Sequence, residues 1–154
     1  MKLYLIQHGE ATTEEVDLHR PLTAKGRSDV EKISSFLKGA GVRPNAILHS
    51  GKTRARQTAE ILAAHLGPDF PIKERQGLAP NDSVHGLLQE VSEIPNDLMI
   101  IGHLPFLGKL ASTLLAGSEI KNLVAFRQGG VVCLQRNEDQ PWQVAWMITP
   151  ELLK

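Results

Sequence analysis

The stretch KLYLIQHGEAT, residues 2–12, begins as an apolar run and stops abruptly at a glutamine, a histidine and a glycine. An unbroken apolar run is typical of a strand buried on both faces of a parallel sheet, so residues 2–7 are predicted to begin the sheet. Two later stretches have the same form: AILHS at 46–50 and DLMIIG at 97–102, which His103 follows. The sequence therefore predicts three buried strands that each end at a histidine.

The segments between these strands have apolar residues at helical spacing and are predicted to form helices. Apolar residues at helical spacing, such as Val30, Ile33 and Leu37, predict faces that pack on the sheet. The predicted helices run from a Thr23 cap to about Lys38, over about 52–66 after a Ser50 cap, over 83–93, and onward from Pro105 at a first helical position.

The C-terminal part of the chain has a different pattern. GVVCLQR (130–136) and QVAWMI (143–148) flank the turn-like NEDQP, which favours an antiparallel hairpin, and PIKER (71–75) is a weak further strand. The alternation of strands and helices predicts a three-layer, doubly wound α/β fold. Its sheet is mainly parallel, with helices on both faces and the antiparallel hairpin at one edge. Without a repeat or a linker, residues 1–154 are predicted to form a single domain.

Composition narrows the class of protein. With 154 residues, 42% of them hydrophobic and 22% charged, the chain is typical of a globular protein. A formal net charge of zero argues against non-specific nucleic-acid binding, and the N-terminal apolar run is too short to span a membrane. Cys133 is the only cysteine, so the chain forms no intrachain disulfide and suits a reducing compartment. We expect a cytoplasmic monomer that binds neither nucleic acid nor membrane.

The predicted strand ends place histidines and an arginine at one edge of the sheet. In open α/β sheets ligands bind outside the carboxyl ends of the strands, where His8, His49 and His103 would lie, with Arg54 in the first turn of the next helix. Helix N-termini at the same edge attract anions. A lone histidine at a strand end is commonly a hydrogen-bonded turn residue, and we favour that interpretation for His49. Together, the other groups indicate a phosphate site with a nucleophile.

Four motifs in a fixed order resemble a known family. QHGEA (7–11), RPLTAKG (20–26), SGKTRARQTAEIL (50–62) and IIGHLPFL (100–107) are similar to the signature elements of the histidine phosphatase, or phosphoglycerate-mutase-like, superfamily. The small size and the tail WMITPELL (146–153) look most like the SixA-type phosphohistidine phosphatases.

The resemblance implies a role for each matching residue. His8 would be the nucleophile that forms a phosphohistidine intermediate, Arg54 would clamp the phosphoryl oxygens, and His103 would donate a hydrogen bond to them. The Gly9 backbone and Arg20 would add phosphate contacts, although Arg20 is equally well explained as a solvated loop charge. Arginine and imidazole would supply the positive charge, so neither a metal nor a cofactor is expected.

The chain departs from the family pattern at residue 7. Gln7 stands where the family usually has an arginine, so this phosphate contact keeps an N–H donor but loses the charge and the two-pronged geometry. Lys25, Lys52 or Arg20 could compensate. Without compensation, phosphate affinity or rate would fall by on the order of tenfold to a hundredfold.

The general acid is the least defined part of the predicted site. Glu10 and Asp17 are the nearest carboxylates in sequence, but a phosphohistidine substrate has a leaving group that is readily protonated. We therefore predict a phosphohistidine phosphatase that acts on a histidine-containing phosphotransfer or signalling protein. Two alternatives stay open: a phosphatase of small phosphate esters, and a phosphoprotein-binding module left inactive by Gln7.

Overall fold

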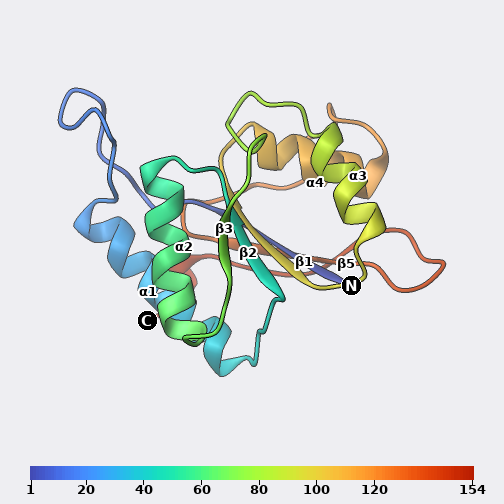
Figure 1. The fold of residues 1–154 in the computed structure, drawn as a ribbon, viewed down its shortest axis with the longest axis horizontal. Coiled ribbons are helices and arrows are strands. Elements are labelled where there is room, and N and C mark those ends of the chain that lie inside the picture. The colour runs from blue at the N-terminus through green and yellow to red at the C-terminus, as the bar shows by residue number, and fades with distance from the viewer.

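The computed structural model describes residues 1–154 and shows one six-stranded sheet with helices on both faces (Figure 1). The strand order is β3-β2-β4-β1-β5-β6. β1 to β4 run parallel to one another, and β5 is antiparallel to both of its neighbours, β1 and β6. The strands are β1 (Lys2–Gln7), β2 (Ala46–His49), β3 (Ile72–Glu74), β4 (Leu98–Gly102), β5 (Val131–Gln135) and β6 (Gln143–Ile148). The helices are α1 (Ala24–Gly39), α2 (Thr53–Leu66), α3 (His85–Glu93), α4 (Phe106–Ala116) and the 3-10 turn η1 (Pro150–Leu152).

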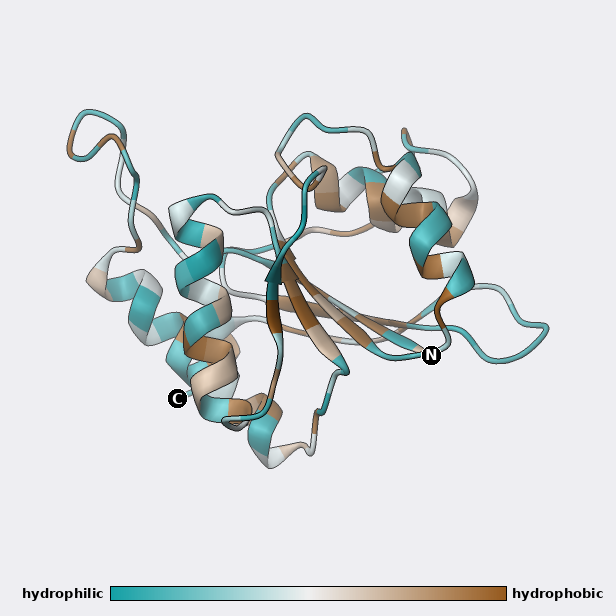
Figure 2. Cartoon of the chain, in the orientation of Figure 1, coloured by the Kyte–Doolittle hydropathy of each residue, from teal (hydrophilic) through white to brown (hydrophobic).

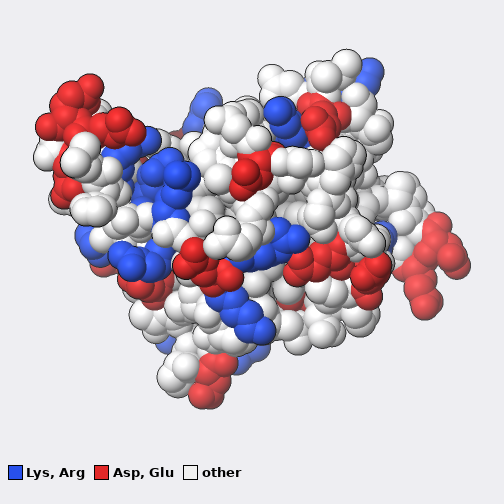
Figure 3. All heavy atoms as spheres, turned by 45° about the horizontal axis from the view of Figure 1, so that its top comes forward, with Lys and Arg blue, Asp and Glu red and all other residues white.

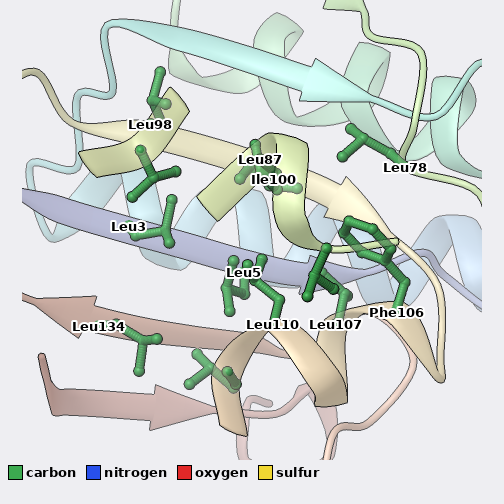
Figure 4. Close-up of a cluster of buried hydrophobic side chains, with 14 of the residues drawn as sticks. Leu3, Leu5, Leu78, Leu87, Leu98, Ile100, Phe106, Leu107, Leu110 and Leu134 are labelled. Carbon is green, nitrogen blue, oxygen red and sulfur yellow. The ribbon is translucent and has the colours of Figure 1, made fainter. Parts of the chain in front are cut away.

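Successive side chains of β1 point to opposite faces of the sheet, so this strand contributes to two hydrophobic cores. Tyr4 and Ile6 join the cluster under α1 and α2, whereas Leu3 and Leu5 join the cluster under α3 and α4. Figure 4 shows the second cluster, in which Leu110 of α4 lies over Leu5. Because both faces of β1 are covered, its sequence is continuously apolar rather than alternating.

The helices form the two outer layers. α1 and α2 lie on one side of the sheet and α3 and α4 on the other, and Figure 2 shows apolar strands enclosed between helices with hydrophilic outer surfaces. The predicted three-layer α/β fold with a mainly parallel sheet and an antiparallel β5–β6 edge hairpin is therefore confirmed. No helix is both long enough and apolar enough to cross a membrane.

The predicted starts of α2, α3 and α4 differ from the structure by only one or two residues, but the predicted cap of α2 is wrong. α2 begins at Thr53 with Lys52 as its cap, because Gly51 adopts a left-handed φ of 88° and turns the chain before the helix starts. Ser50 is therefore not the cap of α2. α4 begins at Phe106, so Pro105 occupies the cap position rather than the first helical position. Thr23 does cap α1, since its side chain accepts a hydrogen bond from the Gly26 amide at 2.9 Å.

The strand register brings the predicted site to one edge. Gln7 of β1 pairs with Gly102 of β4, and His49 of β2 pairs with Ile101. The chain segments that leave β1, β2 and β4 therefore start side by side. The candidate residues that follow these strands meet there.

Candidate active site

His8 follows the last residue of β1 and is only 6% exposed. Its Nδ1 lies 2.7 Å from the carbonyl oxygen of Gly9, and Nε of Arg54 donates to its Nε2 at 3.3 Å. A carbonyl can only accept, so Nδ1 carries the proton and Nε2 keeps its lone pair. The lone pair of Nε2 is therefore directed toward the guanidinium, where an anion would bind.

The surroundings of His8 keep its imidazole neutral. Burial is the largest effect and lowers the pKa of His8 to about 4, the hydrogen bond to Gly9 opposes it, and the charges of Arg54 and Arg20 lower the pKa further. At neutral pH the ring is unprotonated at Nε2, which is the state that a nucleophile requires.

His103 is the second histidine of the site and lies beside the first. The ring centroids of His8 and His103 are 5.0 Å apart. Nε2 of His103 is 2.6 Å from Oγ of Ser50, and its Nδ1 is buried without a partner. Burial, followed by His8 and the cations Arg54, Lys52 and Arg20, lowers the pKa of His103 to about 3. This ring is neutral as well.

Residues in the first two turns of α2 contact His8 and the loop that follows it. Arg54 reaches His8 from the first turn. One turn later, Oγ1 of Thr58 accepts the Gly9 amide hydrogen at 3.1 Å and itself donates to the Arg54 carbonyl at 2.8 Å. Oε1 of Gln57 accepts the amide hydrogen of Leu22 at 2.8 Å. The motif SGKTRARQTAEIL thus places a guanidinium against His8 and fixes the loop that carries this histidine.

Glycines allow this loop to lie directly on α1. A Cβ on Gly9 would come within 2.9 Å of Cγ2 of Val30 and 3.0 Å of the Gly26 carbonyl. A Cβ on Gly26 would collide with the backbone of Glu10. Both positions therefore require glycine because backbone packs on backbone.

Gln7 directly precedes His8 in the chain, and Arg20 belongs to the loop that follows His8. Oε1 of Gln7 is buried and has no hydrogen-bond partner. Nε of Arg20 donates to the Thr12 carbonyl at 3.0 Å, and its charge acts on both histidines. Among the lysines named as compensating charges, Lys52 acts on His103, whereas Nζ of Lys25 is held by Asp29 at 2.7 Å.

The two candidate acids point elsewhere. The carboxylate of Glu10 is 3.9 Å from Nζ of Lys25 and lines a cavity of about 400 Å³ that neither His8 nor His103 borders. Oδ1 of Asp17 accepts the amide hydrogen of His19 at 2.9 Å within an exposed loop. His49 accepts the Gly51 amide hydrogen at 3.1 Å, which is the strand-end role expected for it.

Sequence reasoning missed two residues that hold the site. The sequence predicts Ser50 as a helix cap, yet its hydroxyl contacts His103. It predicts no role for Thr58, whose hydroxyl accepts the Gly9 amide hydrogen. The signal for both was present, because each is a named position of the motif at 50–62.

Comparison with known proteins shows the family. The sequence profile of the histidine phosphatase superfamily (branch 1) matches residues 3–93. The chain belongs to the histidine phosphatase superfamily. The profile extends from β1 to α3, with β3 included, and therefore contains His8, Arg54 and the α2 motif.

Two relatives cover most or all of the chain. An uncharacterized protein of Picosynechococcus is 37% identical over 88% of this chain and 85% of its own. Phosphohistidine phosphatase SixA of Escherichia coli is 25% identical over 100% of this chain and 97% of its own. The family prediction is thus confirmed, and the chain is SixA-like.

Solved structures of the superfamily share the fold. The protein histidine phosphatase SixA in complex with tungstate superposes with a TM-score of 0.87 at 25% identity, over 100% of both chains. A putative α-ribazole-5'-P phosphatase of Escherichia coli superposes at 0.80 with 18% identity over 97% of both chains, which shows the fold alone. The expectation of a phosphatase of this superfamily is supported at that level. The single domain, the substrate, the monomeric state and metal independence stay predictions.

Proposed function

We propose that this protein is a phosphohistidine phosphatase that acts on a phosphotransfer or signalling protein through a covalent phospho-His8 intermediate. The observation that carries the proposal is the state of His8: a neutral imidazole whose unprotonated Nε2 lies 3.3 Å from Nε of Arg54. The SixA structure holds tungstate, a tetrahedral oxyanion with the shape of phosphate. Homology to phosphohistidine phosphatase SixA supports the choice of substrate.

The reaction has two displacements at phosphorus. In the first, Nε2 of His8 attacks in line, the P–N bond to the substrate imidazole breaks, and that imidazole takes up a proton as it leaves. In the second, water attacks phospho-His8, which breaks the new P–N bond and releases inorganic phosphate. An imidazole leaving group is basic enough to take its proton from solvent, so the remote position of Glu10 does not block this chemistry.

Fixed donors stabilise the phosphoryl oxygens in both steps. Arg54 supplies a guanidinium, and Arg20 and Lys52 add positive charge nearby. Oγ of Ser50 accepts the Lys52 amide hydrogen at 3.3 Å and is free to donate its own to Nε2 of His103. The proton of His103 is then on Nδ1, the buried atom without a partner, and a phosphoryl oxygen would accept it. The Gly9 backbone and the Gln7 amide complete the proposed phosphate contacts, and no step requires a metal ion.

Single-turnover reaction with a phosphohistidine-bearing phosphotransfer domain tests the proposal, with His8→Ala as the control. Loss of phosphate from the substrate with the wild type, but not with the variant, is the expected result. Addition of a chelator should leave the rate unchanged. Binding without turnover would contradict the catalytic proposal and favour a phosphoprotein-binding module, and turnover of small phosphate esters alone would favour the ester phosphatase.

A further inference from the structure

A loop next to the site projects from the body of the protein. Residues 12–21, here called the arm, leave the loop of His8 and return to α1, and they form the outlying dark blue loop of Figure 1. The base of the arm is fixed, because the Thr12 amide donates to the Pro21 carbonyl at 2.9 Å and Ala11 pairs with Leu22 in an antiparallel bridge. The arm is therefore held in place relative to His8.

The tip of the arm exposes two large apolar side chains. Val16 is 75% exposed and Leu18 is 84% exposed. A polar turn needs neither residue for its own stability, since the arm is held by backbone hydrogen bonds at its base. Apolar side chains on a projecting, polar-rimmed surface are the usual mark of a protein interface.

Charge on the arm is opposite to charge at the site. Glu14, Glu15 and Asp17 are exposed around the two apolar residues, and Figure 3 shows acidic side chains gathered on the projecting loop with basic side chains beside them. The acidic residues of the arm lie close to the basic residues of the site. Burial and the charge of Arg20 lower the pKa of Arg54, whereas the nearby carboxylate of Glu14 raises it. A ligand that spans both regions needs an anion at one end and cations at the other.

We propose that the arm is a docking element for the phosphorylated protein substrate, an inference that rests on the proposed function. The partner places its phosphoryl-imidazole against Arg54 and His8. An apolar patch beside that imidazole receives Val16 and Leu18, and basic side chains around the patch face the acidic residues of the arm. This pattern fits a protein surface, because a small metabolite reaches His8 without reaching the tip of the arm.

The test compares a protein substrate with a small one. The variant Val16→Ser/Leu18→Ser should raise KM for a phosphohistidine-bearing phosphotransfer domain by roughly tenfold or more. Its kcat/KM for free phosphohistidine should equal that of the wild type. Ile120→Ser/Leu123→Ser is the matched control: these residues are 86% and 53% exposed but follow α4, whose 11 residues run roughly 16 Å away from His103. The control should change neither substrate.

A second variant isolates the charge. Glu14→Gln/Glu15→Gln/Asp17→Asn should lower kcat/KM for the protein substrate at low salt and flatten its dependence on ionic strength. Equal kinetics of the Val16→Ser/Leu18→Ser variant and the wild type on the protein substrate would overturn the docking role. Failure of the wild type to release phosphate from either substrate would instead overturn the proposed function. Equal losses on both substrates would assign the arm to active-site structure and also refute docking.

Discussion

The side chain at residue 7 determines whether the proposed phosphate site has a further positive charge, so replacing Gln7 with arginine is the most informative perturbation. Both histidines are neutral, with pKa values of about 4 and 3, and the fixed charge near them comes from Arg54, Arg20 and Lys52. The Gln7 amide contributes dipoles only, and its Oε1 has no donor to accept from. Gln7→Arg exchanges that unused acceptor for a charged donor.

The expected gain follows from hydrogen-bond strengths. A hydrogen bond to a charged group is worth about 1.5–3 kcal/mol, against about 1 kcal/mol between neutral groups. The difference, about 0.5–2 kcal/mol, corresponds to roughly 2- to 30-fold tighter binding of a tetrahedral oxyanion. Without an anion, the added guanidinium repels Arg54 and Arg20, so the free variant should be less stable than the wild type and should regain stability when phosphate binds.

Calorimetric titration with tungstate or orthophosphate measures this gain directly. Gln7→Lys separates charge from geometry, because an ammonium group cannot bind two oxygens in a planar fork and should give a smaller gain. Gln7→Met keeps the length but removes the amide donors and should bind more weakly than the wild type. Equal affinities of the wild type, Gln7→Arg and Gln7→Met would refute the idea that residue 7 contacts the anion.

The remaining predictions concern stability and the position of the nucleophile. The pKa values of His8 and His103 lie below the ordinary 6.5, so the stability of the fold should be complete above pH 6.5 and fall as the pH drops toward 4. The loss should reach up to about 1.4 kcal/mol per pH unit for each histidine. In urea titrations, His103→Gln should lose less stability at acidic pH than the wild type. Gly26→Ala should destabilise the protein by about 1–3 kcal/mol through its collision with the loop backbone, whereas Gly39→Ala, which meets nothing within 4 Å, should be neutral or stabilising in the same assay. Thr58→Val leaves the Gly9 amide without its acceptor and should cost about 1–3 kcal/mol and slow phosphorylation of His8 in single-turnover experiments.

Local patterns were sufficient to predict where the strands lie, because a strand buried on both faces, such as β1 or β4, has a continuous apolar sequence. The same patterns could not show where polar side chains turn. Ser50 looked like a helix cap, but the left-handed turn at Gly51 delays α2 and frees the hydroxyl for His103, which is 53 positions away in sequence. Glu10 follows His8 closely in sequence, yet its carboxylate is drawn to Lys25. Such contacts depend on tertiary packing and leave no periodic signal.

Burial of the histidine pair explains how an arginine-poor site can still perform the proposed chemistry. A protonated His8 could not attack phosphorus, and a solvated imidazole with its ordinary pKa would be partly protonated in mildly acidic conditions. Burial and the Arg54 charge both oppose protonation, and the Gly9 carbonyl holds the one remaining proton on Nδ1. The hydrogen bond between Thr58 and the Gly9 amide and the contact of Gly9 with α1 therefore support the proposed nucleophile, because they keep His8 buried. Loosening this loop would admit water and raise the pKa of His8. We therefore expect Thr58→Val to slow the first displacement more at pH 6 than at pH 8, because a His8 with a raised pKa is partly protonated at the lower pH.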